Sequence, residues 1–228
     1  YLQSCSGGIF EGDDLRLRIA AGEGAAAHVA TAASTVVHSM GSQAASQQVE
    51  LHAREGSFLE YFPDPTILFP RSRLANKVRV RLHADATVIL GDALLLHDPR
   101  GNGDLFTSLY SETRIEDESG KLLVCDRFRI EGQDLGRSRA GINGNFVAQG
   151  TLFAAAPAGS ATQLMAAMRD ALAGIPDIYA GASLLPSSAG AWMRLLARDA
   201  VGLRAGLHAA WAAIRRQLTG NLPMPRRK

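Results

Sequence analysis

Side chains able to bind metals or perform catalysis are scattered along the chain. The six histidines show no HxH or HExxH spacing, and neither cysteine has a partner at the spacing of a zinc site. His97-Asp98 is an adjacent imidazole and carboxylate that together could bind a divalent ion, although each histidine is also typical of a surface or strand position. No GxSxG nucleophile elbow is present. Spacing alone therefore predicts no catalytic centre.

A short segment containing two prolines, residues 60–65, places two carboxylates close together. Glu60 and Asp64 could form the carboxylate site of a β-rich hydrolase. Carboxylates in such turns are usually solvated, and nothing else in the chain supplies an electrophile or a cofactor-binding motif. This hydrolase interpretation stays open beside that of a purely structural binding module.

Glycines near the start of the chain resemble a phosphate loop, because they let backbone N–H groups approach an anion. They lie in Ser6-Gly7-Gly8 and Gly12-Asp13. No GxxxxGK[ST] motif or nearby lysine accompanies them, and the following segment alternates like a strand. A tight turn that enters a strand is the better interpretation.

Alternating and continuous apolar runs predict strands through the first 150 residues, without an intervening helical pattern. We expect an all-β sandwich, barrel or stacked-strand body, although no motif repeats at a fixed period. A hairpin is expected around Ser119-Gly120. The other expected strands are Leu15–Ile19, Ala27–Thr31, Val49–Ala53, Val78–Leu82, Thr87–Leu90 and Ala93–Leu96.

The last third of the chain predicts two helices. Ser160 is the expected cap of a helix over Ala161–Ala173, and a second helix follows Asp199 and ends at Gly220. A hairpin is expected between them, around residues 186–190. Trp211 on the second helix could anchor a partner, or its apolar stripe could cover the β body. We predict one β-rich domain over residues 1–222 and a mobile basic tail over 223–228.

Composition and charge exclude several classes of protein. Hydrophobic residues make up 46% and charged residues 20%, so a disordered or collagenous chain is excluded. The formal charge of +2 gives no indication of nucleic-acid binding or of a polybasic membrane anchor. No apolar run is long enough to span a bilayer, and the chain does not start like a signal peptide. We therefore expect a soluble cytoplasmic protein.

Taken in order, several motifs resemble the urease accessory protein D family, called H in some species. Cys5-Ser6-Gly7-Gly8 is followed by Gly12-Asp13 and a strand, and then by the Ala/Thr-rich stretch 30–37. Residues 59–69 follow, with Glu60, Pro63 and Phe69 at the motif positions, and Trp211-x-x-x-Arg215 lies near the end. The resemblance covers nearly the whole chain.

The resemblance implies a β-helix-like stack of strands with two C-terminal helices, and a non-catalytic assembly factor. Family members join accessory proteins F and G, the latter a GTPase, and bind apo-urease while nickel is installed. They are thought to offer nickel a passage, so we expect no tightly bound cofactor and only transient Ni²⁺. Nucleic acid and membrane are not expected partners.

Within this resemblance, Asp13 and Glu60 are the predicted contacts of nickel in transit, with His97 and Asp98 as weaker candidates. Transit requires weak, exchangeable ligands. In the alternative interpretation, Asp13 caps a turn and Glu60 bonds a backbone N–H. Trp211 and Arg215 are the candidates for partner binding.

The chain departs from the family pattern in two places. It opens at the Ser-Gly-Gly motif, where family members have further strands, so it resembles a family member truncated at its N-terminus. A stack without those strands would expose an edge. The family's arginine is also displaced in residues 98–106, although Gly103, Asp104 and Phe106 fit.

Overall fold

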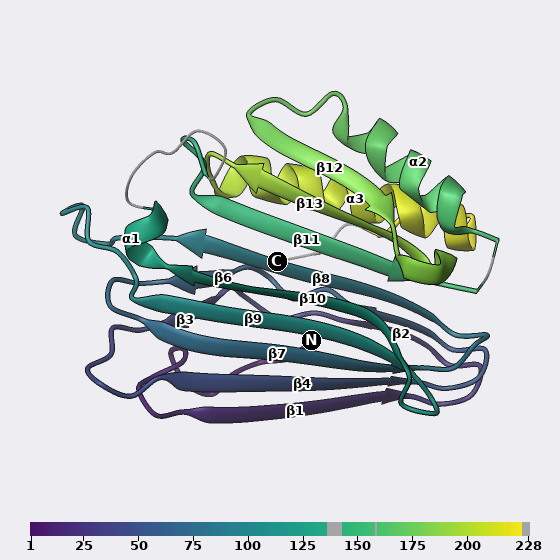
Figure 1. The fold of residues 1–228 in the computed structure, drawn as a ribbon, viewed down its shortest axis with the longest axis horizontal. Coiled ribbons are helices and arrows are strands. Elements are labelled where there is room, and N and C mark those ends of the chain that lie inside the picture. Colours follow the sequence, from purple (N-terminus) through teal and green to yellow (C-terminus); the bar gives the residue numbers. More distant parts are fainter. Residues whose placement is uncertain (136–142, 158, 225–228) are drawn as a thin grey trace.

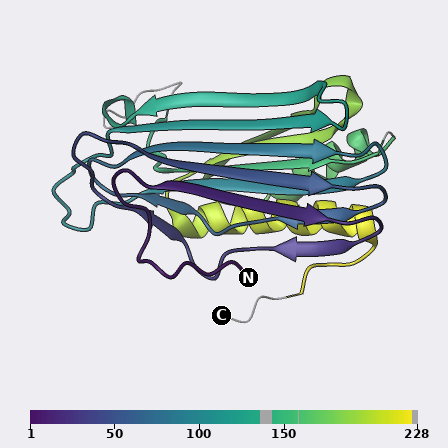
Figure 2. The same cartoon turned by 90° about the horizontal axis from the view of Figure 1, so that it is seen from below.

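The computed structural model describes residues 1–135, 143–157 and 159–224, and the protein is built mainly from two β-sheets (Figure 1). The first sheet contains five strands, which lie side by side in the view from below (Figure 2). The first four of these strands are mutually parallel, and the fifth is antiparallel to its neighbour. In spatial order they are β1 (Asp14–Ala21), β4 (Ala45–Ala53), β7 (Arg73–Leu82), β9 (Ser108–Asp117) and β10 (Leu122–Glu131).

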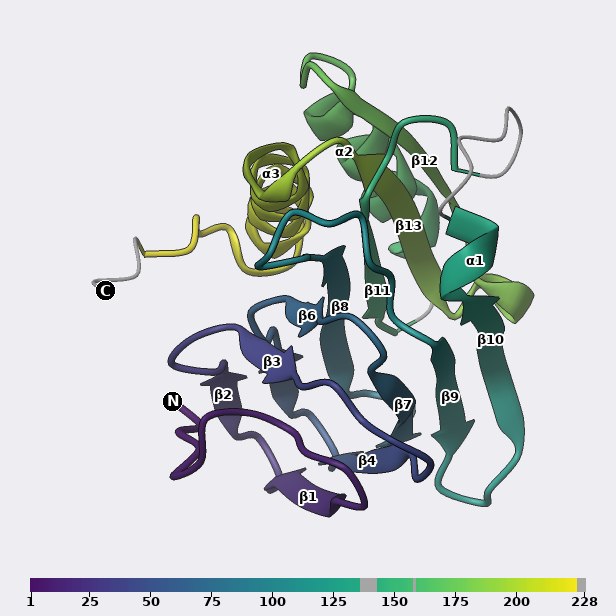
Figure 3. The ribbon, with the colours of Figure 1, turned by 90° about the vertical axis from the view of Figure 1, so that its left-hand side faces the viewer.

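The second sheet contains eight strands and lies opposite the first (Figure 3). Two short strands, β3 (Thr35–Val37) and β6 (Thr66–Leu68), pair with each other, and β6 also pairs with the end of the central strand β8. The main path of this sheet is β12 (Ile178–Leu184), β13 (Gly190–Ala197), β11 (Ala148–Ala155), β8 (Thr87–Leu96), β5 (Phe58–Tyr61) and β2 (Ala26–Val29).

The chain coils alternately through the two sheets, which gives a β-solenoid-like stack of about three turns. Asp14 pairs with Ser46, and Ser46 pairs with Ala75, so successive coils stack in parallel but differ in length. These unequal lengths explain why the sequence shows no fixed period. The expected mainly-β, β-helix-like stack is confirmed.

The strand β8 merges two apolar runs that the sequence analysis kept separate. It continues through Gly91 and Asp92 without a break. Its side chains alternate between two cores: Leu90 packs in the core between the sheets, and Ile89 packs in the core beneath the helices. Burial on both faces explains the nearly continuous apolar sequence.

Both predicted hairpins are confirmed. β9 and β10 pair antiparallel, with Ser119 and Gly120 in the turn between them. β12 and β13 pair antiparallel around a short 3₁₀ turn, Pro186–Ser188.

Two long helices, α2 (Ala161–Leu172) and α3 (Ala200–Thr219), cover one face of β11, β12 and β13, and Figure 3 shows this packing end-on. A four-residue helix, α1 (Gly132–Leu135), was not predicted. None of the helices in the described parts of the chain is long and apolar enough to cross a bilayer. Residues 225–228 of the predicted tail lie outside the described residues.

The helix ends show one correct and one wrong prediction of capping. Asp199 accepts a hydrogen bond from the N–H of Gly202 at 2.8 Å, and Gly220 ends α3 in the left-handed conformation at φ 74°. Ser160 was expected to cap α2 in the same way. Its backbone is already helical (φ −91°, ψ −17°), and its hydroxyl donates to the carbonyl of Pro157 instead. A capping residue needs an extended backbone to turn its oxygen toward the helix.

Candidate functional site

Glu60 is a buried carboxylate at the centre of a cluster of side chains between β5 and α3. Its side chain is almost completely buried, and its Oε1 accepts a hydrogen bond of 2.9 Å from the indole N–H of Trp211. Its Oε2 forms an ion pair with Arg215 and lies 3.1 Å from Nδ1 of His28. Both carboxylate oxygens therefore have partners within this chain.

Aromatic packing surrounds the same carboxylate. The ring of Trp211 stacks on Phe62 and His28, with centroid distances of 5.0 and 5.2 Å. Phe62 in turn occupies the space above Gly91 of β8, where any Cβ would collide with its ring. Trp211 is buried at 4% exposure, so the apolar stripe of α3 covers the β body and its indole is enclosed within this chain.

The electrostatics of the cluster keep Glu60 ionised. Burial by itself raises the pKa of this carboxyl, but hydrogen bonds from His28, Trp211 and Arg215 outweigh it and leave the pKa below its ordinary value. A buried carboxylate is stable only when it is paired and hydrogen-bonded in this manner. The cluster therefore fastens α3 to the strand stack.

Asp13 forms a turn at the entrance to β1. Its Oδ2 accepts a hydrogen bond of 2.9 Å from the N–H of Phe10, and its own N–H donates to the carbonyl of Phe10 at 3.2 Å. Gly12, just before it, has a φ of 79°, which glycine adopts without strain. This is the turn-capping geometry that the alternative interpretation of Asp13 describes.

His97 and Asp98 use their side chains separately. The ring of His97 packs at 5.7 Å from Phe69, which also contacts His38 at the same centroid distance. The carboxylate of Asp98 accepts hydrogen bonds from the N–H groups of Arg100 and Asp104, at 3.0 and 3.1 Å. Within the described residues, no group of three or more His, Cys, Asp or Glu side chains is placed to hold a metal ion.

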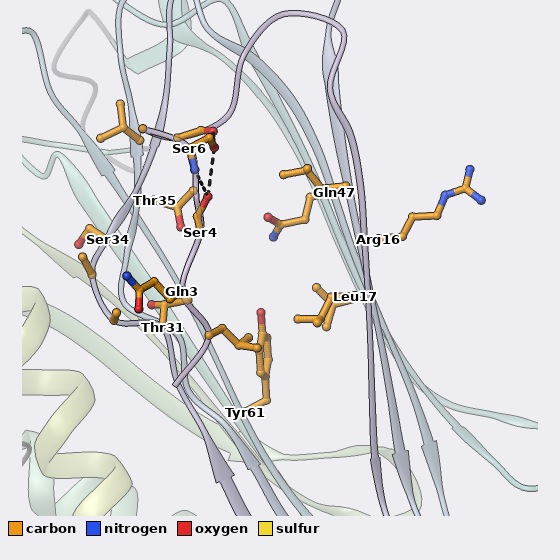
Figure 4. Close-up of a pocket in the computed structure, with 18 residues that line it drawn as sticks. Gln3, Ser4, Ser6, Arg16, Leu17, Thr31, Ser34, Thr35, Gln47 and Tyr61 are labelled. Carbon is orange, nitrogen blue, oxygen red and sulfur yellow. Dashed lines mark hydrogen bonds between the residues drawn. The ribbon is translucent and has the colours of Figure 1, made fainter.

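A surface pocket of about 570 Å³ opens where the N-terminal segment passes β1 and the stretch 31–36. The motif residues Ser6, Gly7 and Gly8 line its outer part. Figure 4 shows Ser4 and Ser6 on the N-terminal segment, with Gln47 and Tyr61 on the side nearer β1. The pocket thus lies between the Ser-Gly-Gly motif and β1, the strand at one end of the five-stranded sheet.

A smaller cavity of about 40 Å³ adjoins this pocket, with lining residues from both sheets. Beyond their shared residues, the cavity reaches Pro63, Asn76 and Asp92. Water-sized spaces with polar walls can hold water. The two adjoining cavities together are called the passage below. The residues common to both cavities are Thr31, Thr35, Gln47, Val49 and Tyr61.

Two carboxylates, Asp64 and Asp92, line the inner cavity. Asp92 lies on β8. Burial between the sheets raises its pKa, and the charge of Asp126 adds to that effect. The hydroxyl of Ser111 lies 3.5 Å from its Oδ2. Asp126 itself forms an ion pair with Arg194 of β13. Asp92 is therefore an acidic residue between the sheets that keeps part of its surface exposed and lines a space able to hold water or an ion.

Asp92 and Glu60 lie on opposite sides of the second sheet. On β5, Tyr61 faces the passage while Glu60 faces α3, because neighbouring residues of a strand point to opposite faces. Glu60 contributes to the helix contact, whereas other residues singled out from the sequence line the passage: Ser6, Gly7, Gly8, Pro63 and Asp64. The sequence analysis did not single out Asp92. The only feature of the sequence that marks Asp92 is its position as an acidic residue between two apolar runs.

Comparison with known proteins identifies the family. The family model of the UreD urease accessory proteins matches residues 1–228. Urease accessory protein UreD 1 of Pseudomonas syringae pv. syringae (strain B728a) is 44% identical over 228 residues, covering 100% of this chain and 80% of that relative. UreD 1 of Methylorubrum extorquens (strain PA1) is 37% identical over 100% of this chain and 77% of that protein. The chain belongs to the UreD family of urease accessory proteins.

Proposed function

We propose that this protein assists the maturation of urease by offering nickel a passage into the apo-urease active site. It does so without catalysing a reaction, as a cytoplasmic component of a complex with accessory proteins F and G. Family membership supports the role in urease maturation. The passage that ends at Asp92 supports the handling of a metal ion.

The observation that carries this proposal is the placement of Asp92. Asp92 shares the lining of this cavity with Asp64. Two carboxylates in a polar space attract a divalent cation, but they supply too few ligands to hold one tightly. The amide and hydroxyl groups of Gln47, Thr35 and Tyr61 line the route to it. An ion moving along this route exchanges weak oxygen ligands and water, as transit requires.

The nickel contacts predicted at Asp13 and Glu60 stay predictions. Glu60 is saturated by protein donors, and Asp13 is engaged in its turn, so the proposed route depends on Asp92. The same saturation removes the support for a hydrolase site at Glu60 and Asp64, since Glu60 offers no free oxygen to a substrate or water.

Edge strand β12 supports the proposed binding of partner proteins. It pairs with β13 on one side and lies at the end of the eight-stranded sheet. Tyr179 is 71% exposed and Leu184 42% exposed, which places large apolar side chains on this edge strand. Arg169 already donates to one of its backbone carbonyls, that of Ala182. Edge strands of this kind readily accept another chain.

Urease activation at limiting nickel tests the passage. Asp92→Asn removes the charge, and Thr35→Met narrows the space shared by the two cavities. We expect both variants to retain co-purification with accessory proteins F and G but to activate urease several-fold more slowly, with recovery at excess nickel. Asp85→Asn, at an exposed turn, is the control. Wild-type activation by both passage variants at limiting nickel would overturn the proposed route.

A further inference from the structure

A pocket rich in arginine lies on the outer face of the five-stranded sheet, at the ends of β1, β4 and β7. Its volume is about 290 Å³. It is far along the strands from the Ser-Gly-Gly motif, which packs near their beginnings, and it shares no lining residue with the passage. The residues that line it are Arg18, His52, Ala53, Arg54, Arg81 and Glu118.

The strand register explains why these basic groups converge. His52 of β4 pairs with Arg81 of β7 and, on its other side, with Ala20 of β1. Arg18 lies two residues before Ala20 and pairs with Glu50. Parallel strands are about 4.8 Å apart, and alternate residues share a face. Long side chains from three successive coils therefore reach one pocket.

The charges in the pocket are unequal. Three arginines stand against one glutamate, Glu118, which lies 3.6 Å from Nε2 of His83. Arg18 is 3.8 Å from Glu50, on the same outer face. Throughout the described ranges, no carboxylate lies within 4.0 Å of the guanidinium groups of Arg54 or Arg81.

Arg79 lies two residues from Arg81 on the same face of β7, but unlike Arg81 it has a carboxylate partner. Its guanidinium is bound to Glu116 at 2.8 Å and is thereby neutralised. Most arginines on this sheet follow that pattern, whereas Arg54 and Arg81 present their donors to the pocket. A guanidinium has five N–H donors in a planar fork that fits the oxygens of phosphate or carboxylate.

The pKa of His52 indicates the sign of the electrostatic potential inside the pocket. Its pKa is held below the ordinary value first by burial, and then by the charges of Arg18, Arg81 and Arg54. Glu50, whose Oε2 is 4.0 Å from Nε2 of the ring, acts in the opposite direction but does not prevail. The local potential is therefore positive.

We propose that this pocket binds an oxyanion of the phosphate class, a small tetrahedral dianion held by Arg54 and Arg81 with Arg18 and His52 beside it. A dianion matches the two positive charges of Arg54 and Arg81, which have no ion-pair partner among the described residues. Its oxygens can receive N–H groups from several directions at once, as side chains from three coils supply them. This site is independent of the passage and of the proposed nickel delivery.

Isothermal titration calorimetry with sodium phosphate at pH 7 and constant ionic strength tests the site, using the chain alone or in its co-purified complex. We expect one saturable site. Arg54→Gln and Arg81→Gln should each weaken it about tenfold, the loss of one charge-assisted pair of hydrogen bonds. Arg129→Gln is the matched control, because Arg129 lies on the same sheet but pairs with Glu131 at 2.7 Å.

Two further titrations identify the class of ligand. Glutarate replaces phosphate to test a dicarboxylate, and sodium chloride tests screening alone. Saturable phosphate binding that depends on Arg54 and Arg81 supports the proposal. Equal binding of glutarate and phosphate, equal effects of all three arginine variants, or no saturable phosphate binding with native thermal stability would each overturn it. Thermal unfolding without anion shows whether each variant is folded.

Discussion

The indole N–H of Trp211 donates a 2.9 Å hydrogen bond to the carboxylate of Glu60, across 151 positions of sequence. These two residues belong to separate motifs, one of which predicted a nickel contact and the other a partner contact. In the folded chain, together with Arg215 and His28, they form one cluster around the buried carboxylate. The long separation means that the cluster forms only when α3 docks on the completed strand stack.

Removal of Arg215 should destabilise this docking strongly. Arg215→Ala leaves Glu60 buried without its cation, which costs about 3 kcal/mol. We expect a clear fall in the free energy of unfolding, measured by urea denaturation. Arg216→Ala is the control, since Arg216 is the next residue on the helix but is exposed. Equal stability of the two variants would show that the ion pair does not hold α3.

The stability contributed by Glu60 should depend on pH. Hydrogen bonds hold its pKa below the ordinary value of 4.5, so the native state binds fewer protons there than the unfolded state does. Its contribution is therefore complete above pH 4.5 and is lost as pH falls through the native pKa. We expect the stability difference between wild type and Glu60→Gln to shrink below pH 4.5. A constant difference from pH 7 to the acid transition would contradict this prediction.

Much of the fold could be predicted because each local pattern agrees with its final environment. Alternation over Val78–Leu82 matches a strand with one buried and one exposed face. Alternation over Leu15–Ile19 also matches a strand, but Leu15 is exposed and Leu17 and Ile19 are only partly buried. Asp199 and Gly220 mark the ends of α3 by their own chemistry. The coiling itself was not evident from residue spacing, since each coil has a different length. The β-helix-like stack was predicted from the family resemblance instead.

The candidate site was harder to predict, because it depends on which face of a strand each residue occupies in three dimensions. Glu60 and Tyr61 are neighbours, yet only Tyr61 lines the passage. Asp92 interrupts an apolar strand, but a single acidic residue does not reveal the cavity beside it. Arg215 was placed in a motif without any indication that it reaches Glu60. Such tertiary pairings have no local signature.

Conservative changes at Asp13 and Glu60 distinguish metal contact from structural roles. An asparagine at position 13 can still accept the N–H of Phe10, so Asp13→Asn should leave both thermal stability and urease activation unchanged. Glu60→Gln should lower the melting temperature, because a neutral amide cannot pair with Arg215. Reduced activation at limiting nickel, with native stability and intact binding of accessory protein F, would instead support the predicted nickel contacts.

Asp92→Asn should increase stability while reducing function. Burial raises the pKa of Asp92 above its ordinary value of 3.8. Between pH 3.8 and the native pKa, the native state therefore binds more protons at this residue than the unfolded state does. Stability is therefore lost as pH increases through the native pKa, and an asparagine, which does not titrate, avoids this loss. At pH 7 we expect a higher melting temperature for Asp92→Asn, together with slower urease activation at limiting nickel. Residues kept for function at a cost in stability behave in this way. A lower melting temperature at pH 7 would show that Asp92 supports the fold instead, and any loss of activation would then follow from unfolding.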